Sequence, residues 1–403
     1  MGMDERFVIF GSINDDPVVR AAEDRDQGEA IRRLVVFAEE NGVCGDVWRA
    51  YLCRLLAGDD NVFSRAVELT GRCGTSLERL ARADLSAARR RMDSHAGLLT
   101  DYEPTRPVPP LSGMAAAAPG TMAYTASIQR LGEAFASGDD AAYDALTAHY
   151  RTLGRGVSAR HIALAWSEQS ESLEGVEDFD RIAMDELVGI DIQKRILTEN
   201  TERFLRGAGA NNILLFGDSG TGKSSCVKAL VNRYHTDGLR LVELTKHQLG
   251  DLEKVLLLLV NSRHRYLVFL DDLSFEEGEL GYKRLKAALE GKAAVTPENV
   301  LFYATSNRRH LIRESWADRV TEQEDVHISD TMQEKLSLSE RFGLRVVFPS
   351  PSQNTYLAIV ESYLRRSGIP FTDELRMRAI QWELAYNGRS GRTARQFVRS
   401  LEG

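Results

Sequence analysis

Short, nearly uninterrupted apolar runs dominate the hydrophobic pattern of the chain from about residue 178 onward. They are NILLF, LRLVEL, YLVFL, VLFYAT and LRVVF, at 212–216, 239–244, 266–270, 300–305 and 344–348. Runs of this kind are typical of buried parallel strands. The segments between them have helical periodicity over about ten to fifteen residues, which makes a series of β-α units. The pattern therefore predicts an α/β domain over 178–350, with a parallel sheet of about five strands between helices.

The rest of the chain has helical periodicity. Apolar residues recur at three- and four-residue spacing in AIRRLVVFAEENG and DVWRAYLCRLLAG, and both segments stop at glycine. We therefore predict a mostly α-helical domain over 1–100. The helical pattern resumes after the next segment and runs to about residue 170, so 122–177 is interpreted as a helical bridge. Amphipathic helices return in 351–403, which is predicted to be a small helical appendage.

A proline cluster separates the first two helical regions. Five of the ten prolines fall within 101–121, at Pro104, Pro107, Pro109, Pro110 and Pro119. Proline fixes φ and removes a hydrogen-bond donor, and the alanine, glycine and serine around these prolines offer little to bury. The segment is therefore predicted to be an extended, semi-rigid linker.

Composition narrows the class of protein. The 403 residues contain 43% hydrophobic and 27% charged residues, which is typical of globular proteins and argues against a disordered or collagen-like chain. The formal net charge of −8 does not favour nucleic acid as a partner, since such binders usually carry a basic surplus. Arg89, Arg90 and Arg91 form a local basic cluster that keeps this partner open, although a solvated helical face explains them more simply.

The chain carries no sign of secretion or membrane insertion. No segment approaches the roughly 18 apolar residues of a membrane span, and the N-terminus lacks an apolar signal-peptide region. The four cysteines show neither paired spacing nor companion histidines, so they support no disulfide framework or zinc site. We expect a cytoplasmic protein with no membrane partner.

The strongest chemical signal is GDSGTGKS at 217–224, which matches the phosphate-binding pattern G-x-x-x-x-G-K-[ST] between a strand and a helix. Its glycines would let backbone N–H groups turn toward a β-phosphate, while Lys223 would contact the β- and γ-phosphates. The hydroxyl of Ser224 would bind Mg²⁺. The predicted nucleotide-binding residues here are Gly217, Asp218, Ser219, Gly220, Thr221, Gly222, Lys223, Ser224 and Ser225.

Polar residues at two strand ends complete a candidate hydrolytic site. Asp271 ends YLVFL and is the second candidate Mg²⁺ ligand, and Asp272 is placed to orient a water molecule. Asn307 follows VLFYAT and would help to position the same water. Aspartates that cap a turn and a turn-forming asparagine are the simpler alternatives, but the upstream phosphate loop favours function.

With these motifs in this order, residues 178–403 resemble an AAA+ ATPase. More narrowly, FLDDLSFEEGE, YATSNRRHLI and EKLSLSERFGL resemble an uncharacterised bacterial AAA+ family of predicted ATPases with a domain of unknown function. The resemblance covers a little over half of the chain. It implies a P-loop AAA+ core with a C-terminal helical lid, and ATP and Mg²⁺ as cofactors.

The resemblance also implies roles for residues outside the phosphate loop. Arg341 matches an arginine that reaches the nucleotide of a neighbouring subunit, which implies a homo-oligomer, either a ring or a dimer; an intrachain salt bridge with Glu340 or Glu334 is the alternative. Arg392, or else Arg395, would contact the γ-phosphate from the lid. Val188 and Gly189 match the segment that lines the adenine pocket.

The chain departs from the family pattern at three places. Most AAA+ enzymes have glutamate where this chain has Asp272, which leaves slow hydrolysis, or a role for Glu276 or Glu277, open. The TKHQLG loop lacks the aromatic residue of AAA+ unfoldases, which counts against an unfoldase. The acidic stretch 318–330 is either a partner-contacting insertion or a solvated loop. The Arg308–His310 segment directly follows Asn307, so it would lie near the nucleotide or a subunit boundary, or simply anchor the strand-to-helix turn.

The sequence therefore predicts an ATP-binding, Mg²⁺-dependent ATPase that remodels or loads a macromolecular partner, an expectation that rests on family analogy. The helical N-terminal domain would bind a protein partner. The alternative is a nucleotide-gated binding module, similar to a helicase loader, in which ATP occupancy matters more than turnover.

Overall fold

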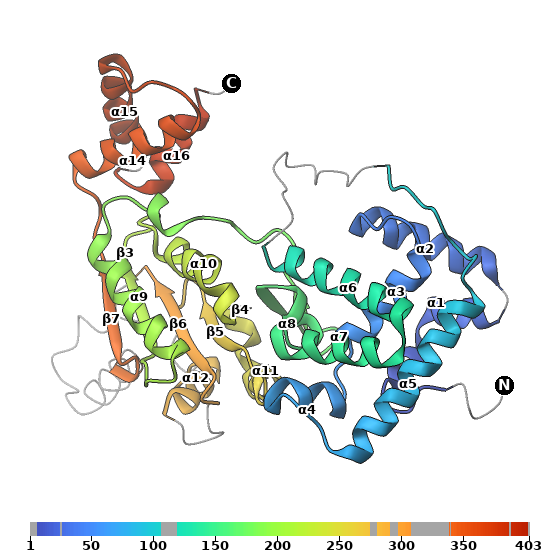
Figure 1. Cartoon of the computed structure of the whole chain (residues 1–403). Helices are drawn as coiled ribbons and strands as arrows, with labels where there is room; N and C mark the ends of the chain where they lie inside the picture. The colour runs from blue at the N-terminus through green and yellow to red at the C-terminus, as the bar shows by residue number, and fades with distance from the viewer. Residues whose placement is uncertain are drawn as a thin grey trace. The chain divides into compact units, whose positions relative to one another are not determined.

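The computed structural model describes residues 6–24, 26–105, 119–274, 280–290, 297–307, 338, 340–386 and 388–401. The chain divides into two compact units: Met1–His161 with Asn261–His264, and Ile162–Val260 with Arg265–Gly403. The first is built from helices, and the second contains the sheet. Figure 1 labels the α-helices of both and strands β3–β7 of the second.

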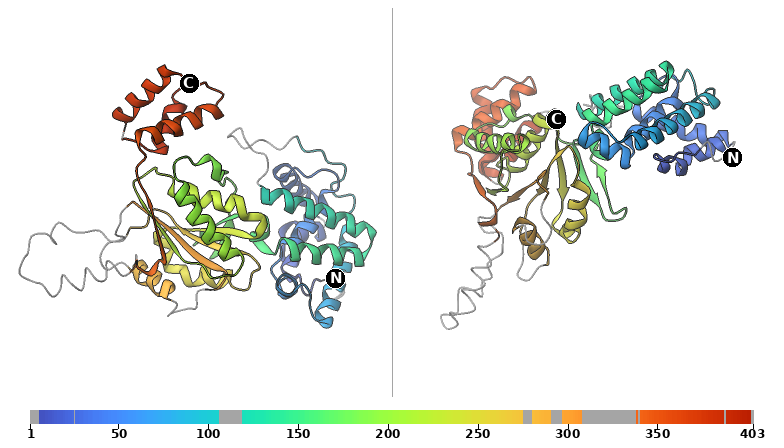
Figure 2. Two further views of the ribbon diagram at one scale, coloured as in Figure 1. Left: turned by 60° about the vertical axis from the view of Figure 1, so that its left-hand side comes forward. Right: turned by 60° about the horizontal axis from the view of Figure 1, so that its bottom comes forward.

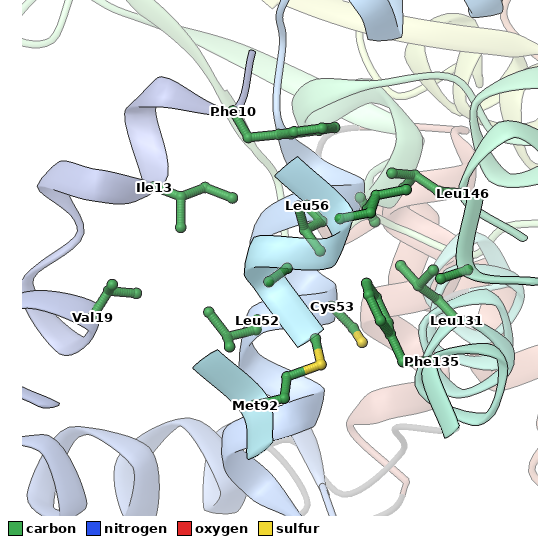
Figure 3. Packing of buried hydrophobic residues seen from close by; sticks show 14 of the residues in the cluster. Phe10, Ile13, Val19, Leu52, Cys53, Leu56, Met92, Leu131, Phe135 and Leu146 are labelled. Carbon is green, nitrogen blue, oxygen red and sulfur yellow. The ribbon is translucent and has the colours of Figure 1, made fainter. Parts of the chain in front are cut away.

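The first unit has the helices that the apolar spacing predicts. They are the 3-10 helix η2 (Gly11–Asp15) and the α-helices α1 (Pro17–Glu23), α2 (Gln27–Asn41), α3 (Val47–Gly58), α4 (Val62–Thr70), α5 (Thr75–Ser94), α6 (Pro119–Ser137), α7 (Asp139–Thr152) and α8 (Gly156–Arg160). Leu52 and Leu56 of α3 belong to the same buried core as Phe135 of α6 and Leu146 of α7 (Figure 3). The helices on both sides of the proline-rich segment therefore share one hydrophobic core.

An acidic side chain fixes the beginning of this unit. Asp84 of α5 is 2% exposed, and its carboxylate accepts hydrogen bonds from the backbone N–H groups of Val8, Ile9 and Phe10 at 2.6–3.1 Å. A buried carboxylate needs such donors to offset the loss of water. Asp84 thus ties the N-terminal segment to a helix more than seventy residues away.

A second buried carboxylate joins α4 to a segment from the later part of the chain. Glu68 forms an ion pair with Arg155, and its other oxygen accepts from the Ser262 hydroxyl at 3.0 Å and the Arg263 backbone N–H at 2.8 Å. The side chains of Glu68 and Arg155 are 1% and 9% exposed. Arg155 also donates to the Asn261 carbonyl oxygen at 3.2 Å. Asn261–His264 is therefore an integral part of the helical unit.

We expect Asp84→Ala to lower the free energy of unfolding of the helical unit by about 3–4 kcal/mol. The substitution leaves three N–H groups without an acceptor, and each costs about 1–3 kcal/mol where water cannot replace the carboxylate. Hydrogen exchange followed by mass spectrometry on the full chain measures this in peptides from α5. Asp93→Ala, which removes an exposed carboxylate from the same helix, is the matched control. Equal exchange rates in the two variants would contradict the role of Asp84.

The second unit contains a seven-stranded sheet. Its strands are β1 (Ala163–Ser167), β2 (Ser172–Gly175), β3 (Ile213–Gly217), β4 (Leu239–Leu244), β5 (Arg265–Leu270), β6 (Val300–Ser306) and β7 (Leu344–Phe348). They lie in the order β2-β1-β4-β5-β6-β3-β7, and every neighbouring pair is parallel except β1 with β2. The α/β fold class and the five predicted strands are confirmed.

The prediction of helix to about residue 170 is wrong, because β1 and β2 lie within the segment interpreted as a helical bridge. The alanine and leucine residues of ALAWS favour helix locally. Pairing with β4 overrides that preference, since three residues of β1 lie in parallel register with Leu241–Glu243. Helices α6–α8 belong to the first unit and the two strands to the second.

Helices cover both faces of the sheet. They are α9 (Asp191–Leu205), α10 (Lys223–Tyr234), α11 (Leu252–Leu259) and α12 (Leu280–Glu290), with the 3-10 helices η3 (Met184–Glu186), η4 (His235–Asp237) and η5 (Lys246–Asp251). The chain moves along the sheet in one direction from β3 to β4 and in the other from β4 through β5 to β6. Right-handed crossovers therefore place α10 on one face and α11 and α12 on the other, as Figure 2 shows.

Three helices follow β7 and form the predicted C-terminal appendage, called the lid helices below. They are α14 (Gln353–Arg366), α15 (Asp373–Ala385) and α16 (Gly391–Arg399). They have a small core of their own, which includes Tyr356, Val360 and Phe397. Across the described parts of both units, no helix has the length and apolar character needed to cross a bilayer.

Candidate functional site

A cavity of about 590 Å³ lies at the carboxyl ends of the parallel strands, between the phosphate loop, the 349–352 segment and the lid helices. This is the end of an open α/β sheet at which ligands bind, and the volume is within the range of small-molecule sites. The predicted site residues that line the cavity are Val188, Gly189, Ser219, Gly220, Thr221, Gly222, Lys223, Ser224, Ser225, Asp271, Asp272, Asn307, Arg392 and Arg395.

The glycines of the loop occupy backbone conformations that other residues rarely adopt. Gly217, Gly220 and Gly222 have φ values of +142°, +75° and +96°. A Cβ atom on Gly217 would lie 2.0 Å from the carbonyl oxygen of Phe348 in the neighbouring strand. The turn from β3 into the phosphate loop therefore depends on glycine for both conformation and space.

Lys223 is the first residue of α10 and is 6% exposed. Its Nζ donates to the carbonyl oxygens of Gly217 and Asp218, both at 2.7 Å, and to Oδ1 of Asn307 at 3.0 Å. Burial lowers the pKa of Lys223, and nearby aspartates, Asp271 foremost, oppose that shift. The amino group thus lies at the N-terminus of a 12-residue helix, where backbone dipoles and N–H groups also favour an anion.

Ser224 and Asp271 bring two oxygen ligands together beside the loop. The Ser224 hydroxyl donates to Oδ1 of Asp271 at 2.7 Å. Hydroxyl and carboxylate oxygens suit Mg²⁺, which is usually held by one or two protein groups with waters and phosphate oxygens. No cluster of three or more His, Cys, Asp or Glu within the described ranges could hold a metal by itself. The residues therefore fit a magnesium ion that arrives with a nucleotide.

Asp272 and Asn307 form a second polar pair. Nδ2 of Asn307 donates to Oδ1 of Asp272 at 2.7 Å, while its Oδ1 accepts from Lys223. These two contacts fix the orientation of the amide between a cation and a carboxylate. Asp272 has a φ of +51°, in the left-handed region, so its backbone is held in a conformation that costs free energy for a non-glycine residue.

The opposite wall of the cavity comes from the segment before α9 and from the lid helices. A Cβ atom on Gly189 would lie 2.2 Å from Cγ2 of Thr355 in α14, and Gly189 has a φ of +80°. The Gly391 backbone N–H at the start of α16 donates to the Gly220 carbonyl oxygen at 2.9 Å. Arg392 and Arg395 both line the cavity from α16, so the geometry does not separate these two candidates.

Three predicted site residues lie outside the cavity lining. Gly217 and Asp218 contribute carbonyl oxygens to Lys223, and the Asp218 carboxylate accepts from the hydroxyl of Ser350. Arg341 is exposed, just before β7. The predictions for Glu276, Glu277, Arg308–His310 and the stretch 318–330 fall outside the described residues.

Sequence reasoning missed Thr305 and the 349–352 segment. Thr305 and Ser306 are the polar residues that end the apolar run of β6, directly before Asn307. The change from apolar to polar residues inside the strand was the available signal. The segment Pro349–Ser352 lines the cavity because β7 lies next to β3. Nothing in its own sequence indicates this neighbour.

Solved structures with a partial likeness to the chain include the Holliday junction branch migration motor RuvB of Thermotoga maritima. It is 12% identical, covers 54% of this chain and 72% of its own, and has a TM-score of 0.34. ORC1 of Aeropyrum pernix in complex with DNA is 18% identical, covers 52% and 58%, and has a TM-score of 0.37. AMPPCP-bound DnaA of Aquifex aeolicus is 15% identical, covers 56% and 66%, and has a TM-score of 0.38.

The search of curated proteins gives no match. A family model described as "Protein of unknown function (DUF815)" matches residues 159–403, from the last residues before β1 to the end of the lid helices. This range contains every residue of the candidate site. Because it is more than half of the 403 residues, the chain belongs to the DUF815 family.

Proposed function

We propose that the chain binds ATP and hydrolyses it with Mg²⁺. The observation that carries the proposal is the 2.7 Å contact between Ser224 and Asp271 beside the phosphate loop. It brings a loop hydroxyl and a strand-end carboxylate together where a phosphate-bound magnesium ion would need them. The resemblance of residues 178–403 to AAA+ ATPases supports the same conclusion.

The side chains of the site suit phosphoryl transfer to water. Lys223 and the loop N–H groups would bind the phosphates, exchanging the present carbonyl contacts of Lys223 for phosphate oxygens. Ser224 and Asp271 would hold Mg²⁺, which neutralises charge on the phosphates when bound. Asp272 would orient a water molecule for in-line attack. The water oxygen bonds to the γ-phosphorus as the bond to the β–γ bridging oxygen breaks, giving ADP and phosphate.

Asn307 has a defined part in this arrangement. Because it donates to Oδ1 of Asp272, it leaves Oδ2 of that carboxylate to accept a hydrogen bond from water. Val188 and Gly189 would line the adenine site, and Arg392 or Arg395 would bind the γ-phosphate and couple nucleotide state to the lid helices. The contact between Gly391 and Gly220 supports this coupling, because it joins α16 directly to the loop.

We further propose that turnover remodels or loads a macromolecular partner in the cytoplasm, through the helical unit and in a homo-oligomer. The basic cluster of α5 does not favour nucleic acid as that partner. Arg91 is 7% exposed and forms an ion pair with Glu23 at 2.9 Å, and Arg89 pairs with Asp139 at 3.3 Å. Because Arg89 and Arg91 pair with acidic groups of the chain itself, the cluster gives little support to nucleic acid, and a protein partner is the better-supported choice.

The alternative is a nucleotide-gated binding module with slow turnover. Asp272 favours it, because this side chain is one methylene shorter than the glutamate that most AAA+ enzymes have there, and because its carboxylate is already bonded to Asn307. A shorter and tethered carboxylate reaches less far toward an attacking water. This alternative keeps ATP binding and removes most of the hydrolysis.

Two measurements on the full chain test the proposal and separate the alternatives. Titration with a fluorescent ATP analogue, with Mg²⁺ and with EDTA, should show binding that Mg²⁺ strengthens. Phosphate release at saturating MgATP then decides between steady turnover and a gated module, since the module would bind nucleotide but release phosphate only slowly. Absence of binding at millimolar nucleotide would overturn both functions.

A further inference from the structure

Thr305 lines the cavity together with Asp271, Asp272 and Asn307. It is near the carboxyl end of β6, which is hydrogen-bonded to β5 on one side and to β3 on the other. Its parallel partner in β3 is Leu215, two residues before the phosphate loop begins. The side chain is buried, with 2% of the residue exposed. Thr305 therefore links the strand that carries the loop to the strand that ends at the two aspartates.

The hydroxyl of Thr305 contacts both aspartates. It accepts from the Asp272 backbone N–H at 2.9 Å and lies 2.5 Å from Oδ1 of Asp271. A backbone N–H can only donate, so it occupies a lone pair of the hydroxyl. The single hydroxyl hydrogen is then directed to the Asp271 carboxylate, which can only accept when ionised. One buried oxygen thus fixes a side chain of one aspartate and the backbone of the next.

The backbone conformation of Asp272 explains why such a contact is needed. A non-glycine residue in the left-handed region is disfavoured by about 1–3 kcal/mol and persists where its surroundings hold it. Three hydrogen bonds hold the turn at Asp272: the one to the Thr305 hydroxyl, the one from the Leu273 N–H to the Thr305 carbonyl oxygen at 2.7 Å, and the one from Asn307 to the carboxylate. Thr305 supplies two of the three.

Because of this turn, the carboxylates of the adjacent residues Asp271 and Asp272 contact different partners. Asp271 contacts the Ser224 hydroxyl, and Asp272 contacts the Asn307 amide. We propose that Thr305 is a positioning residue that sets the separation of the metal-binding carboxylate from the water-orienting one. The inference rests on the proposed function and adds to it a residue whose effect is transmitted through Asp271 and Asp272. Removing a hydrogen bond of this kind to a metal-binding carboxylate typically lowers metal affinity or activity by about 10–100-fold.

Thr305→Val tests the inference, because valine keeps the branched shape and removes the hydroxyl. The readout is the ratio of ATP-analogue affinities with Mg²⁺ and with EDTA. We expect the Mg²⁺-dependent gain in affinity to fall by about 10-fold or more, while the affinity in EDTA, which depends on the phosphate loop, stays within about twofold of the wild type. Thr305→Ser, which restores a hydroxyl at the same position, should recover most of the loss. Thr305→Ala, which adds no methyl group toward Asp271, is measured beside them in case valine prevents folding.

Thr201→Val is the matched control. Thr201 is also fully buried, and its hydroxyl lies 2.9 Å from the Tyr303 hydroxyl on the same strand, β6. Its replacement should lower thermal stability without changing the Mg²⁺-dependent gain. An unchanged gain in Thr305→Val or Thr305→Ala, or the same loss in Thr201→Val, would overturn the positioning role and leave ATP binding intact. A wild-type chain that bound no nucleotide would overturn the proposed function together with this inference.

Discussion

Lys223→Ala should bind MgATP about 100-fold or more weakly than the wild-type chain. The substitution removes a nearly buried ammonium group from the N-terminus of α10, and loss of one member of a desolvated charge pair typically costs about 2–5 kcal/mol. We expect the position to tolerate this change structurally, because the partners of Nζ are neutral carbonyl and amide oxygens and Lys223 lines the cavity, so that water can enter the space that the side chain leaves. Affinity is measured with the same fluorescent analogue.

Lys228→Ala is the control for the loss of one positive charge on α10. Lys228 lies over the ring of Phe179, at 5.9 Å, and does not line the cavity. Its replacement should leave nucleotide affinity within about twofold, because the half-buried Lys228 contacts Phe179 and not the cavity, and a charge outside the site is screened by solvent and salt. If Lys223→Ala retained wild-type affinity, the loop would not be the phosphate site.

Arg341→Ala should leave nucleotide binding intact and lower the rate of ATP hydrolysis by about 1,000-fold, the lower end of what an arginine supplied by a neighbouring subunit contributes. Arg341 is exposed and does not line the cavity of its own chain, as a residue acting on a neighbour requires. Activity per subunit of the wild-type protein should rise with protein concentration. In Arg341→Ala that rise should be absent.

Mixing two inactive variants separates a contribution in trans from a structural one. Lys223→Ala keeps Arg341, and Arg341→Ala keeps the phosphate loop. A site that combines the phosphate loop of an Arg341→Ala subunit with Arg341 of a neighbouring Lys223→Ala subunit has both parts, so the mixture should recover part of the activity. Arg345→Ala is the matched control, since Arg345 is also exposed and lies on β7, four residues further along the chain. A mixture no more active than its components would contradict the intersubunit role.

The strands of the second unit were predictable where they are buried on both faces. Residues in β5 and β6 are almost all buried, and a strand covered by helices on both sides has to be apolar throughout. The edge of the sheet was harder to predict. Strand β2, SLEG, is antiparallel and half-exposed, so neither alternation nor an apolar run marks it.

The candidate site was predictable as far as its motifs extend in sequence. The residues of the phosphate loop are contiguous in sequence, so one motif identifies them all. Asp271 follows a strand that the apolar pattern identifies. Thr305 contacts both aspartates only because β6 lies beside β5, and strand order is not encoded in any local run of residues. The contact between Gly391 and Gly220 likewise joins segments about 170 residues apart, which only the tertiary structure brings together.

The four residues Asn261–His264 restrict which fragments of the chain can contain a complete helical unit. Because they belong to the helical unit, that unit is discontinuous in sequence, and the chain passes between the two units three times rather than once. A fragment that ends at His161 would lack the donors that Ser262 and Arg263 provide to Glu68, and so would keep a buried carboxylate with part of its hydrogen bonding removed. Partner screens with the helical unit therefore need the full chain, or a fragment in which 261–264 is reconnected through a short linker.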